Sequence, residues 1–248
     1  METIIKQARE VGTSAGVLLP RRWLNKEVIV TLYQPSFEEL AKEAFEILVK
    51  HKLNEDVLGI YLYGSYVREE NEPESDIDIL VITGNTSRLI QERNYELLLI
   101  AKDKLLKNLR KSLAYQWMIR EARAIIDKNL LENMRKQMPV LNVQEQLSEI
   151  RSVTRINRDI IGTCEENCMD VPDGIVYSLV LRLRELYLMW LLKKNQEYMK
   201  REFIRKIGKE AYDAYKRVKN DEEELGVAPD KAQKVLQLIE KWQKELKE

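Results

Sequence analysis

Histidine and cysteine are scarce in the sequence, whose 248 residues include one histidine, His51, and two cysteines, Cys164 and Cys168. A single C-x3-C pair with no histidine nearby makes a poor zinc site, and one histidine leaves little from which to build a Ser-His-Asp triad or a Cys-His dyad. We interpret the two cysteines as ordinary thiols on a helix face, with a redox or metal role as the alternative.

Long apolar runs and net charge are also lacking. No stretch approaches the roughly 18 to 20 consecutive apolar residues of a membrane helix, and the first residues carry charges where a signal peptide is apolar. We therefore expect a cytoplasmic protein with no membrane partner. The 41 Lys+Arg residues balance the 41 Asp+Glu residues, which excludes a polybasic nucleic-acid coat and an acidic disordered tail.

Changes in residue pattern along the chain predict three domains and an α+β fold class. Residues 1–35 predict a small β-hairpin module, because β-branched runs at 3–5 and 27–33 flank a segment punctuated by glycine and proline. Residues 36–142 predict an α/β core with a mixed sheet, and residues 143–248 predict a helical bundle.

Within these domains, hydrophobic spacing predicts the individual elements. Ser36 and Glu39 have the spacing of a capping box, which would open a helix that runs to about residue 52. Apolar runs predict strands, and 3.6-residue spacing predicts helices. The expected core strands are 57–63, 76–82 and 113–119, the core helices 87–109 and 120–133, and the bundle helices 143–160, 174–194, 202–219 and 229–247. Asp173 and Asp230 are expected to cap two of the bundle helices.

The most informative residues stand at the ends of the first two core strands. Gly64 and Ser65 follow the first strand, and Asp76 and Asp78 begin the second. Because side chains alternate along a strand, the two aspartates should point to the same face roughly 7 Å apart and could share divalent cations. Oxygen ligands of this kind favour magnesium or manganese.

Gly64 and Ser65 supply features that suit a phosphate. A glycine lets the backbone approach a polyphosphate closely, and backbone N–H groups and a serine hydroxyl at a helix N-terminus donate to phosphate oxygens. Together with two metal-binding aspartates, this turn predicts a site for a nucleoside triphosphate. Cations that bridge the phosphates would stabilise charge on the leaving pyrophosphate. Arg68 is a further candidate phosphate ligand.

This segment resembles the polymerase-β-like nucleotidyltransferase superfamily, whose signature is hG-S-x(9-13)-D-x-D, and it looks most like the minimal nucleotidyltransferases. The resemblance covers about residues 37–142. It implies that Gly64 and Ser65 bind the phosphates of ATP or another nucleoside triphosphate and that Asp76 and Asp78 bind Mg²⁺ or Mn²⁺. The implied reaction moves a nucleoside monophosphate, AMP in the first instance, to a hydroxyl of a protein, RNA or small molecule.

One departure from the family pattern concerns the third carboxylate. Family members usually carry it on the next strand, where it can act as a base for the acceptor hydroxyl. The strand predicted at 113–119 has no acid and carries Gln116 at its middle, so the nearest candidate is Glu121. Three interpretations stay open: Glu121 bends into the site, the strand register differs, or the protein is a catalytically weak nucleotide-binding regulator of antitoxin-like or DNA-binding type.

The flanking domains carry weaker resemblances. Residues 11–30 resemble the first half of an AbrB/SpoVT-type swapped-hairpin module, which implies a homodimer that binds DNA, with Arg21 and Arg22 as the candidate contacts. The alternative is a dimerisation or packing hairpin with solvated arginines. The helical bundle loosely resembles HEPN-like domains. Their nuclease motif places an arginine four to six residues before a histidine, which His51 lacks, so we expect an acceptor-binding platform instead.

Overall fold

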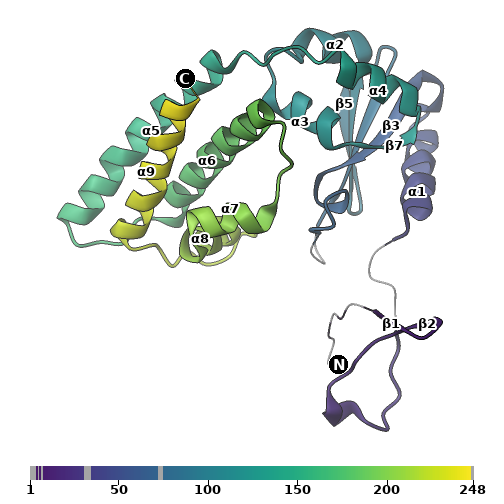
Figure 1. The fold of residues 1–248 in the computed structure, drawn as a ribbon, viewed down its shortest axis with the longest axis horizontal. Helices are drawn as coiled ribbons and strands as arrows, with labels where there is room; N and C mark the ends of the chain where they lie inside the picture. The colour runs from purple at the N-terminus through teal and green to yellow at the C-terminus, as the bar shows by residue number, and fades with distance from the viewer. Residues whose placement is uncertain (1–3, 5, 7, 31–34, 72–74, 247–248) are drawn as a thin grey trace. The chain divides into compact units, whose positions relative to one another are not determined.

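The computed structural model describes residues 4, 6, 8–30, 35–71 and 75–246. The chain divides into two compact units, residues 1–51 and 52–248. Its helices and mixed sheet confirm the predicted α+β class (Figure 1). In the part of the chain that the structure describes, no helix combines the length and the apolar character that crossing a membrane requires.

The first unit holds a short hairpin and one helix. β1 (Arg9–Val11) pairs antiparallel with β2 (Ser14–Gly16), and Gly12 takes a left-handed φ of +60° in the turn between them. The 3-10 helix η1 (Arg21–Trp23) follows. The helix α1 (Phe37–Lys50) confirms the predicted capping box, since the Ser36 N–H donates to Glu39 Oε2 and the Glu39 N–H donates to Ser36 Oγ.

The strands predicted at the two ends of this module are not found where the structure describes them. Residues 27–30 form no strand, and Ile29 is 88% exposed. Their β-branched side chains favour extended backbone, but a strand also needs a partner to accept its hydrogen bonds. The hairpin forms instead at the left-handed turn of Gly12. The rest of the two predicted strands, residues 3, 5 and 31–33, lies outside the described residues.

A mixed sheet organises the first part of the second unit. Within the described residues, its strands are β3 (Val57–Tyr63), β4 (Ile77–Thr83), β5 (Arg88–Glu92), β6 (Tyr95–Ala101) and β7 (Arg123–Ile126), in the order β5-β6-β4-β3-β7. β4 and β6 run parallel and the other neighbouring pairs are antiparallel. The predicted strands at 57–63 and 76–82 are therefore confirmed, and the 3-10 helices η2 (Asn54–Asp56) and η3 (Gly64–Tyr66) precede and follow β3.

The helix predicted at 87–109 is wrong, because this segment is a hairpin of β5 and β6 followed by the short helix α2 (Lys102–Asn108). Arg93 takes a left-handed φ of 55° in the turn. In β6, Tyr95, Leu97 and Leu99 are buried at two-residue intervals. The leucines and isoleucines of this stretch fit helical spacing too, so the spacing alone did not reveal the strand.

The strand predicted at 113–119 is also wrong, because this segment is the helix α3 (Leu113–Glu121). The Ser112 hydroxyl caps it by accepting the Tyr115 N–H, and Leu113, Gln116 and Trp117 are buried at helical spacing. β7 then occupies the start of the helix predicted at 120–133, and α4 (Lys128–Lys136) follows. Leu113 and Trp117 pack in the core of the bundle, whereas Ile119 packs against the sheet, so α3 joins the two cores.

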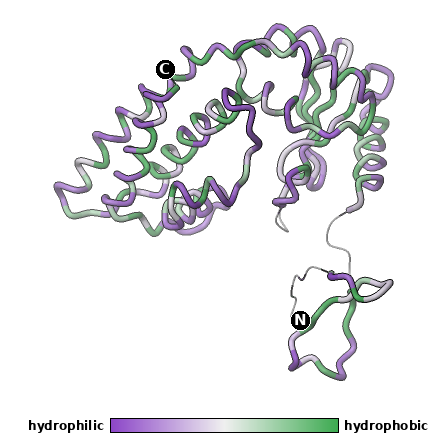
Figure 2. The backbone as a smooth tube through the Cα atoms, in the orientation of Figure 1, coloured by the Kyte–Doolittle hydropathy of each residue, from purple (hydrophilic) through white to green (hydrophobic). Residues whose placement is uncertain are grey.

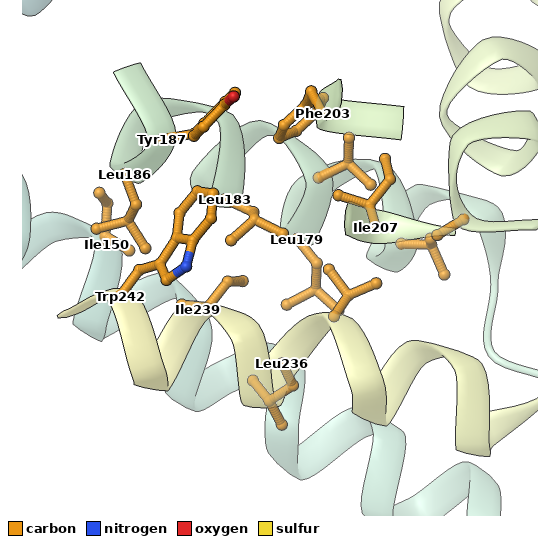
Figure 3. Packing of buried hydrophobic residues seen from close by; sticks show 14 of the residues in the cluster. Ile150, Leu179, Leu183, Leu186, Tyr187, Phe203, Ile207, Leu236, Ile239 and Trp242 are labelled. Atoms are coloured by element: carbon orange, nitrogen blue, oxygen red, sulfur yellow. The ribbon is translucent and has the colours of Figure 1, made fainter. Parts of the chain in front are cut away.

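The helical bundle is confirmed. Its helices are α5 (Val143–Glu166), α6 (Asp173–Lys194), α7 (Lys200–Ile207), α8 (Lys209–Lys219) and α9 (Pro229–Glu245). Figure 2 shows hydrophobic and hydrophilic residues alternating along α5 and α9. The single helix predicted at 202–219 is interrupted by Gly208, whose φ is +87°. The core lies between α6 and α9, where Leu179, Leu183, Ile239 and Trp242 are buried together (Figure 3).

Neither aspartate that we expected to cap a bundle helix does so. α6 begins at Asp173 and α9 contains Asp230 in its first turn, and neither helix has a side-chain cap. Asp173 is fully buried, and its two carboxylate oxygens accept from Arg217 Nε at 2.6 Å and Nη2 at 2.7 Å. The Leu225 N–H donates to the same carboxylate. Asp173 therefore connects the start of α6 with the end of α8.

Cys164 is buried in α5, whereas Cys168 is exposed beyond its end, and both are free thiols.

Replacing Asp173 with alanine should lower the free energy of unfolding by about 3 kcal/mol, because Arg217 then loses its buried partner. The hydrogen bond from Arg217 holds the pKa of Asp173 below its ordinary value of 3.8. The contribution of the carboxylate to the free energy of unfolding is therefore complete above about pH 4. It is lost as the pH falls through the lower pKa of the folded state. Urea unfolding measures this effect. The free energy of unfolding of Asp173→Ala should lie well below that of the wild type at pH 7, and the difference should be smaller at pH 3.

The matched control is Asp230→Ala, which removes an exposed carboxylate that contacts Lys234 at 3.5 Å. Its effect should be about 0.5 kcal/mol or less. Equal unfolding midpoints for Asp173→Ala and the wild type at pH 7 would contradict a stabilising role of the buried pair.

Candidate active site

A cleft of about 430 Å³ lies within the second unit, between the end of the sheet and the helical bundle. Its sheet side is formed by the end of β3, the turn η3 and the start of β4, and α3 lines it as well. Six of the predicted site residues line this cleft: Gly64, Ser65, Arg68, Asp76, Asp78 and Glu121.

Gly64 occupies a position that only glycine fits. Its φ is +77°, and a Cβ atom there would lie 2.1 Å from Asp78 Oδ2. The close approach follows from the pairing of β3 with β4, which places Tyr63 opposite Asp78. The backbone of the predicted phosphate-binding turn therefore contacts the predicted metal-binding carboxylate directly.

The two aspartates lie at the start of β4, where Asp76 precedes the strand and Asp78 is its second residue. Burial raises the pKa of the Asp78 carboxyl to about 6, and the negative charges of Glu96 and Asp76 add to the effect. Carboxylates crowded in this way are costly to ionise unless a cation compensates their charge. The local charge thus favours a bound cation.

Glu96 is a residue of this region that the sequence interpretation missed. β6 runs parallel to β4, and Glu96 is the register partner of Asp78. Register partners on neighbouring strands project to the same face of the sheet. The signal was present as an acid between the alternating apolar residues Tyr95 and Leu97, but the segment fitted a helix equally well. Glu96 also accepts a hydrogen bond from Gln91 Nε2 at 3.1 Å.

Glu121 reaches the turn from the last position of α3. Its Oε1 accepts the Gly64 N–H at 3.0 Å, and its Oε2 accepts from Arg68 Nη1 at 2.6 Å and from Trp117 Nε1 at 3.0 Å. Arg68 also donates from Nε to Glu70 Oε2 at 3.0 Å. Both groups line the cleft, but their charges are already paired with each other.

The carboxylates at the start of β4 can be compared with the ligands that Mg²⁺ commonly takes. Among the described residues, no three His, Cys, Asp or Glu side chains are grouped closely enough to hold an ion by themselves. Mg²⁺ is commonly bound by one or two carboxylates together with substrate phosphates and water, rather than by a complete protein cage. Asp76 and Asp78 fit that pattern, since they offer only oxygen ligands and carry excess negative charge.

The other predicted contacts lie elsewhere in the chain. Arg21 and Arg22 are exposed in η1 and belong to the first unit, so they are separate in sequence and in unit from the residues of the cleft. Gln116, which the sequence placed in a strand, is buried in α3 and donates to the carbonyl oxygens of Leu109 and Pro139. Its role is to hold these loops.

Comparison with known families identifies the sheet-containing part of the chain. Residues 41–140 match the model of the nucleotidyltransferase domain. This stretch contains the glycine-serine turn and both aspartates. The chain thus carries a nucleotidyltransferase domain, and the prediction of a nucleotidyltransferase enzyme is confirmed at that level.

Solved structures similar to the chain include a nucleotidyltransferase-like protein from Exiguobacterium sibiricum. It is 15% identical, with a TM-score of 0.36, and the match covers 83% of this chain and 75% of that one. A second is the spectinomycin adenyltransferase AAD(9) from Enterococcus faecialis, solved with ATP and spectinomycin. It is 15% identical, with a TM-score of 0.41, and the match covers 86% of this chain and 100% of that one. No curated protein matches the chain significantly.

Replacing Gly64 with alanine should weaken binding of a non-hydrolysable ATP analogue by at least about tenfold. The new methyl group must displace Asp78, and the left-handed backbone adds a penalty of roughly 1 kcal/mol. Isothermal titration calorimetry in the presence of Mg²⁺ measures the change.

Gly162→Ala in α5 is the matched control, because nothing lies within 4 Å of the position where its Cβ would be. This variant should bind the analogue like the wild type. Unchanged affinity in Gly64→Ala would show that the turn is not part of the nucleotide site.

Proposed function

We propose that the protein transfers a nucleoside monophosphate, AMP from ATP or its counterpart from another nucleoside triphosphate, to a hydroxyl group of an acceptor. The observation that carries the proposal is the contact of Gly64 with Asp78, which brings a phosphate-binding turn and a cation-binding carboxylate to one point of the cleft. The nucleotidyltransferase match over residues 41–140 supports it.

In the proposed mechanism, Gly64 and Ser65 hold the triphosphate and Asp76 and Asp78 hold Mg²⁺ or Mn²⁺. The cation would neutralise charge on the phosphates and on the leaving pyrophosphate. The two aspartates fix its place next to the turn. Glu121 keeps the turn and Arg68 in position through its hydrogen bonds, which makes it a positioning residue in this proposal rather than the base.

We assign the role of acceptor base to Glu96. Its register position beside Asp78 places it at the same end of the sheet, and the hydrogen bond that the structure shows for its carboxylate comes from Gln91. A carboxylate placed there can take the proton of an attacking hydroxyl. The alternative of a catalytically weak regulator depends on the lack of a third acid and on the AbrB-like N-terminal segment. In the present proposal Glu96 of β6 takes the place of that acid, which favours an enzyme over a regulator.

Asp76→Asn and Asp78→Asn should each reduce transfer of label from [α-³²P]ATP with Mg²⁺ to below one hundredth of the wild-type rate, because the cation loses a ligand. Glu96→Gln should lower kcat by about 10² to 10⁴-fold and leave nucleotide affinity within about twofold. Incubation of the labelled nucleotide with candidate acceptors, followed by gel and thin-layer analysis, measures all three rates.

Asp103→Asn, which removes an exposed carboxylate of α2, is the control and should transfer at the wild-type rate. If Glu121→Gln abolished transfer while Glu96→Gln did not, the assignment of the base would be wrong. Nucleotide binding without transfer to any acceptor would contradict the proposed activity itself.

A further inference from the structure

One carboxylate of the cleft is bound by donors that suit a phosphate group. The Glu121 side chain is only 12% exposed, and three N–H groups converge on it. Its Oε1 accepts the Gly64 N–H at 3.0 Å, and its Oε2 accepts from Arg68 Nη1 at 2.6 Å and from Trp117 Nε1 at 3.0 Å. A backbone N–H of a tight turn and an arginine are frequent donors to phosphate oxygens. Glu121 therefore occupies an anion site at the glycine-serine turn.

A phosphate at this turn would need the same donors. The Gly64 N–H has one hydrogen to donate, so a phosphate oxygen can take a full hydrogen bond from it only when Glu121 Oε1 has left. The positive charge of Arg68 is shared in the same way, because carboxylate oxygens of Glu121 and Glu70 lie 2.6 Å and 3.0 Å from its guanidinium nitrogens. The Glu121 carboxylate and a phosphate group thus compete for one set of donors.

The two sides of the cleft carry opposite charge. The sheet side, together with α3, contributes one cation, Arg68, and four carboxylates, those of Glu70, Asp76, Asp78 and Glu121. The bundle side contributes no carboxylate to the described lining, and its cations include Arg184 and Lys219. A phosphate at the turn would add to the excess of negative charge on the sheet side. Departure of the Glu121 carboxylate from the turn would reduce that excess.

The position of Glu121 in α3 allows its side chain to move without the helix. Glu121 is the last residue of α3, so rotation about its side-chain bonds leaves the helical hydrogen bonds in place. Trp117 lies one turn earlier and packs in the core of the bundle. Its indole N–H therefore stays where it is and can donate to an oxygen that replaces the carboxylate.

We propose that Glu121 is an autoinhibitory contact, whose carboxylate fills the phosphate site of the turn until a nucleoside triphosphate displaces it. The inference rests on the proposed function. Gly64, Arg68 and Trp117 then donate to phosphate oxygens, which makes Trp117 a ligand of the nucleotide. Until this exchange Glu121 holds the turn and Arg68 in position. The contact selects for highly charged ligands, because a ligand shifts such an equilibrium only by as much as it outbinds the carboxylate.

The first test measures binding of a triphosphate with no acceptor present. Isothermal titration calorimetry with inorganic triphosphate and Mg²⁺ gives Kd for the wild type and for Glu121→Gln. If the carboxylate fills the site for about nine-tenths of the time or more, its removal should tighten binding at least about tenfold. Unchanged or weaker binding by Glu121→Gln would show that the carboxylate only supports the turn, and the proposal would be wrong.

Glu70→Gln is the matched control. It removes the same charge from the same cleft and releases Arg68 Nε, but it leaves Glu121 on Gly64 and Trp117. The new amide keeps an oxygen that can accept the Lys200 N–H, as Glu70 does. This variant should tighten binding clearly less than Glu121→Gln. Equal gains would assign the effect to the net charge of the cleft and overturn the proposal.

Trp117→Phe tests whether the indole N–H passes from the carboxylate to the phosphate. Combined with Glu121→Gln, it should weaken binding of inorganic triphosphate about three- to tenfold, because the phosphate loses a donor. In the wild-type background the loss should be smaller, since the substitution then weakens the competing carboxylate as well. Equal losses in the two backgrounds would contradict a donor shared between Glu121 and the phosphate.

A spectroscopic measurement follows the exchange in the unaltered protein. The chain has four tryptophans, and the indole signal that Trp117→Phe removes from the ¹H–¹⁵N spectrum belongs to Trp117. Inorganic triphosphate with Mg²⁺ should shift this signal, because its acceptor changes from carboxylate to phosphate. The other three tryptophans do not line the cleft, and their signals should stay in place. Binding that leaves the Trp117 signal unchanged would overturn the proposal.

These measurements separate the proposed contact from the proposed activity. If triphosphate displaces Glu121 but no acceptor is labelled in the transfer assay, the autoinhibitory contact is supported and the transfer activity fails. If the wild type binds triphosphate and transfers label, but Glu121→Gln gains no affinity, only the autoinhibitory contact fails. If neither the wild type nor Glu121→Gln binds triphosphate, both are wrong.

Discussion

The register of three strands is the constraint on which the site depends. Hydrogen bonding of β4 between β3 and β6 places Asp78 opposite Tyr63 on one side and Glu96 on the other. Because Gly64 directly follows Tyr63, the same register brings its backbone against the Asp78 carboxylate. A shift of β4 by one residue would turn Asp78 to the opposite face of the sheet. The pairing of β4 with β3 and β6 thus decides which side chains meet at the site.

A second set of contacts ties the glycine-serine turn to the bundle. Arg68 lies over Tyr198, Glu70 accepts the backbone N–H of Lys200 at 2.6 Å, and Glu121 holds both Gly64 and Arg68. α3 supports this link because it packs into both cores. The cleft therefore has one wall from each part of the second unit, and the same side chains that fix the turn also set the spacing to the bundle.

Local signals in the sequence predicted the central parts of the fold and site. The capping box at Ser36, the strand 57–63 and the burial pattern of α6 are decided by neighbours in sequence, so spacing was sufficient to predict them. The segment 87–101 was not predictable in this way, since its apolar residues fit both periods and only pairing with β4 selects the strand. Glu96 was missed for that reason. Glu121 was found as the nearest acid, but its bonds to Gly64 and Arg68 join residues more than 50 positions apart.

The opposite charges of the two walls have a consequence for molecules that have not yet touched the protein. Cations on the bundle side and carboxylates on the sheet side set up an electric field across the cleft, and low-dielectric walls concentrate such a field. Without a cation, this field would draw phosphates toward the bundle and away from the carboxylates of the sheet side. A triphosphate would therefore reach Gly64 and Ser65 only when a bound cation offsets that negative charge. The field extends only about a Debye length, roughly 8 Å at physiological salt, so this effect acts inside the cleft and not at a distance.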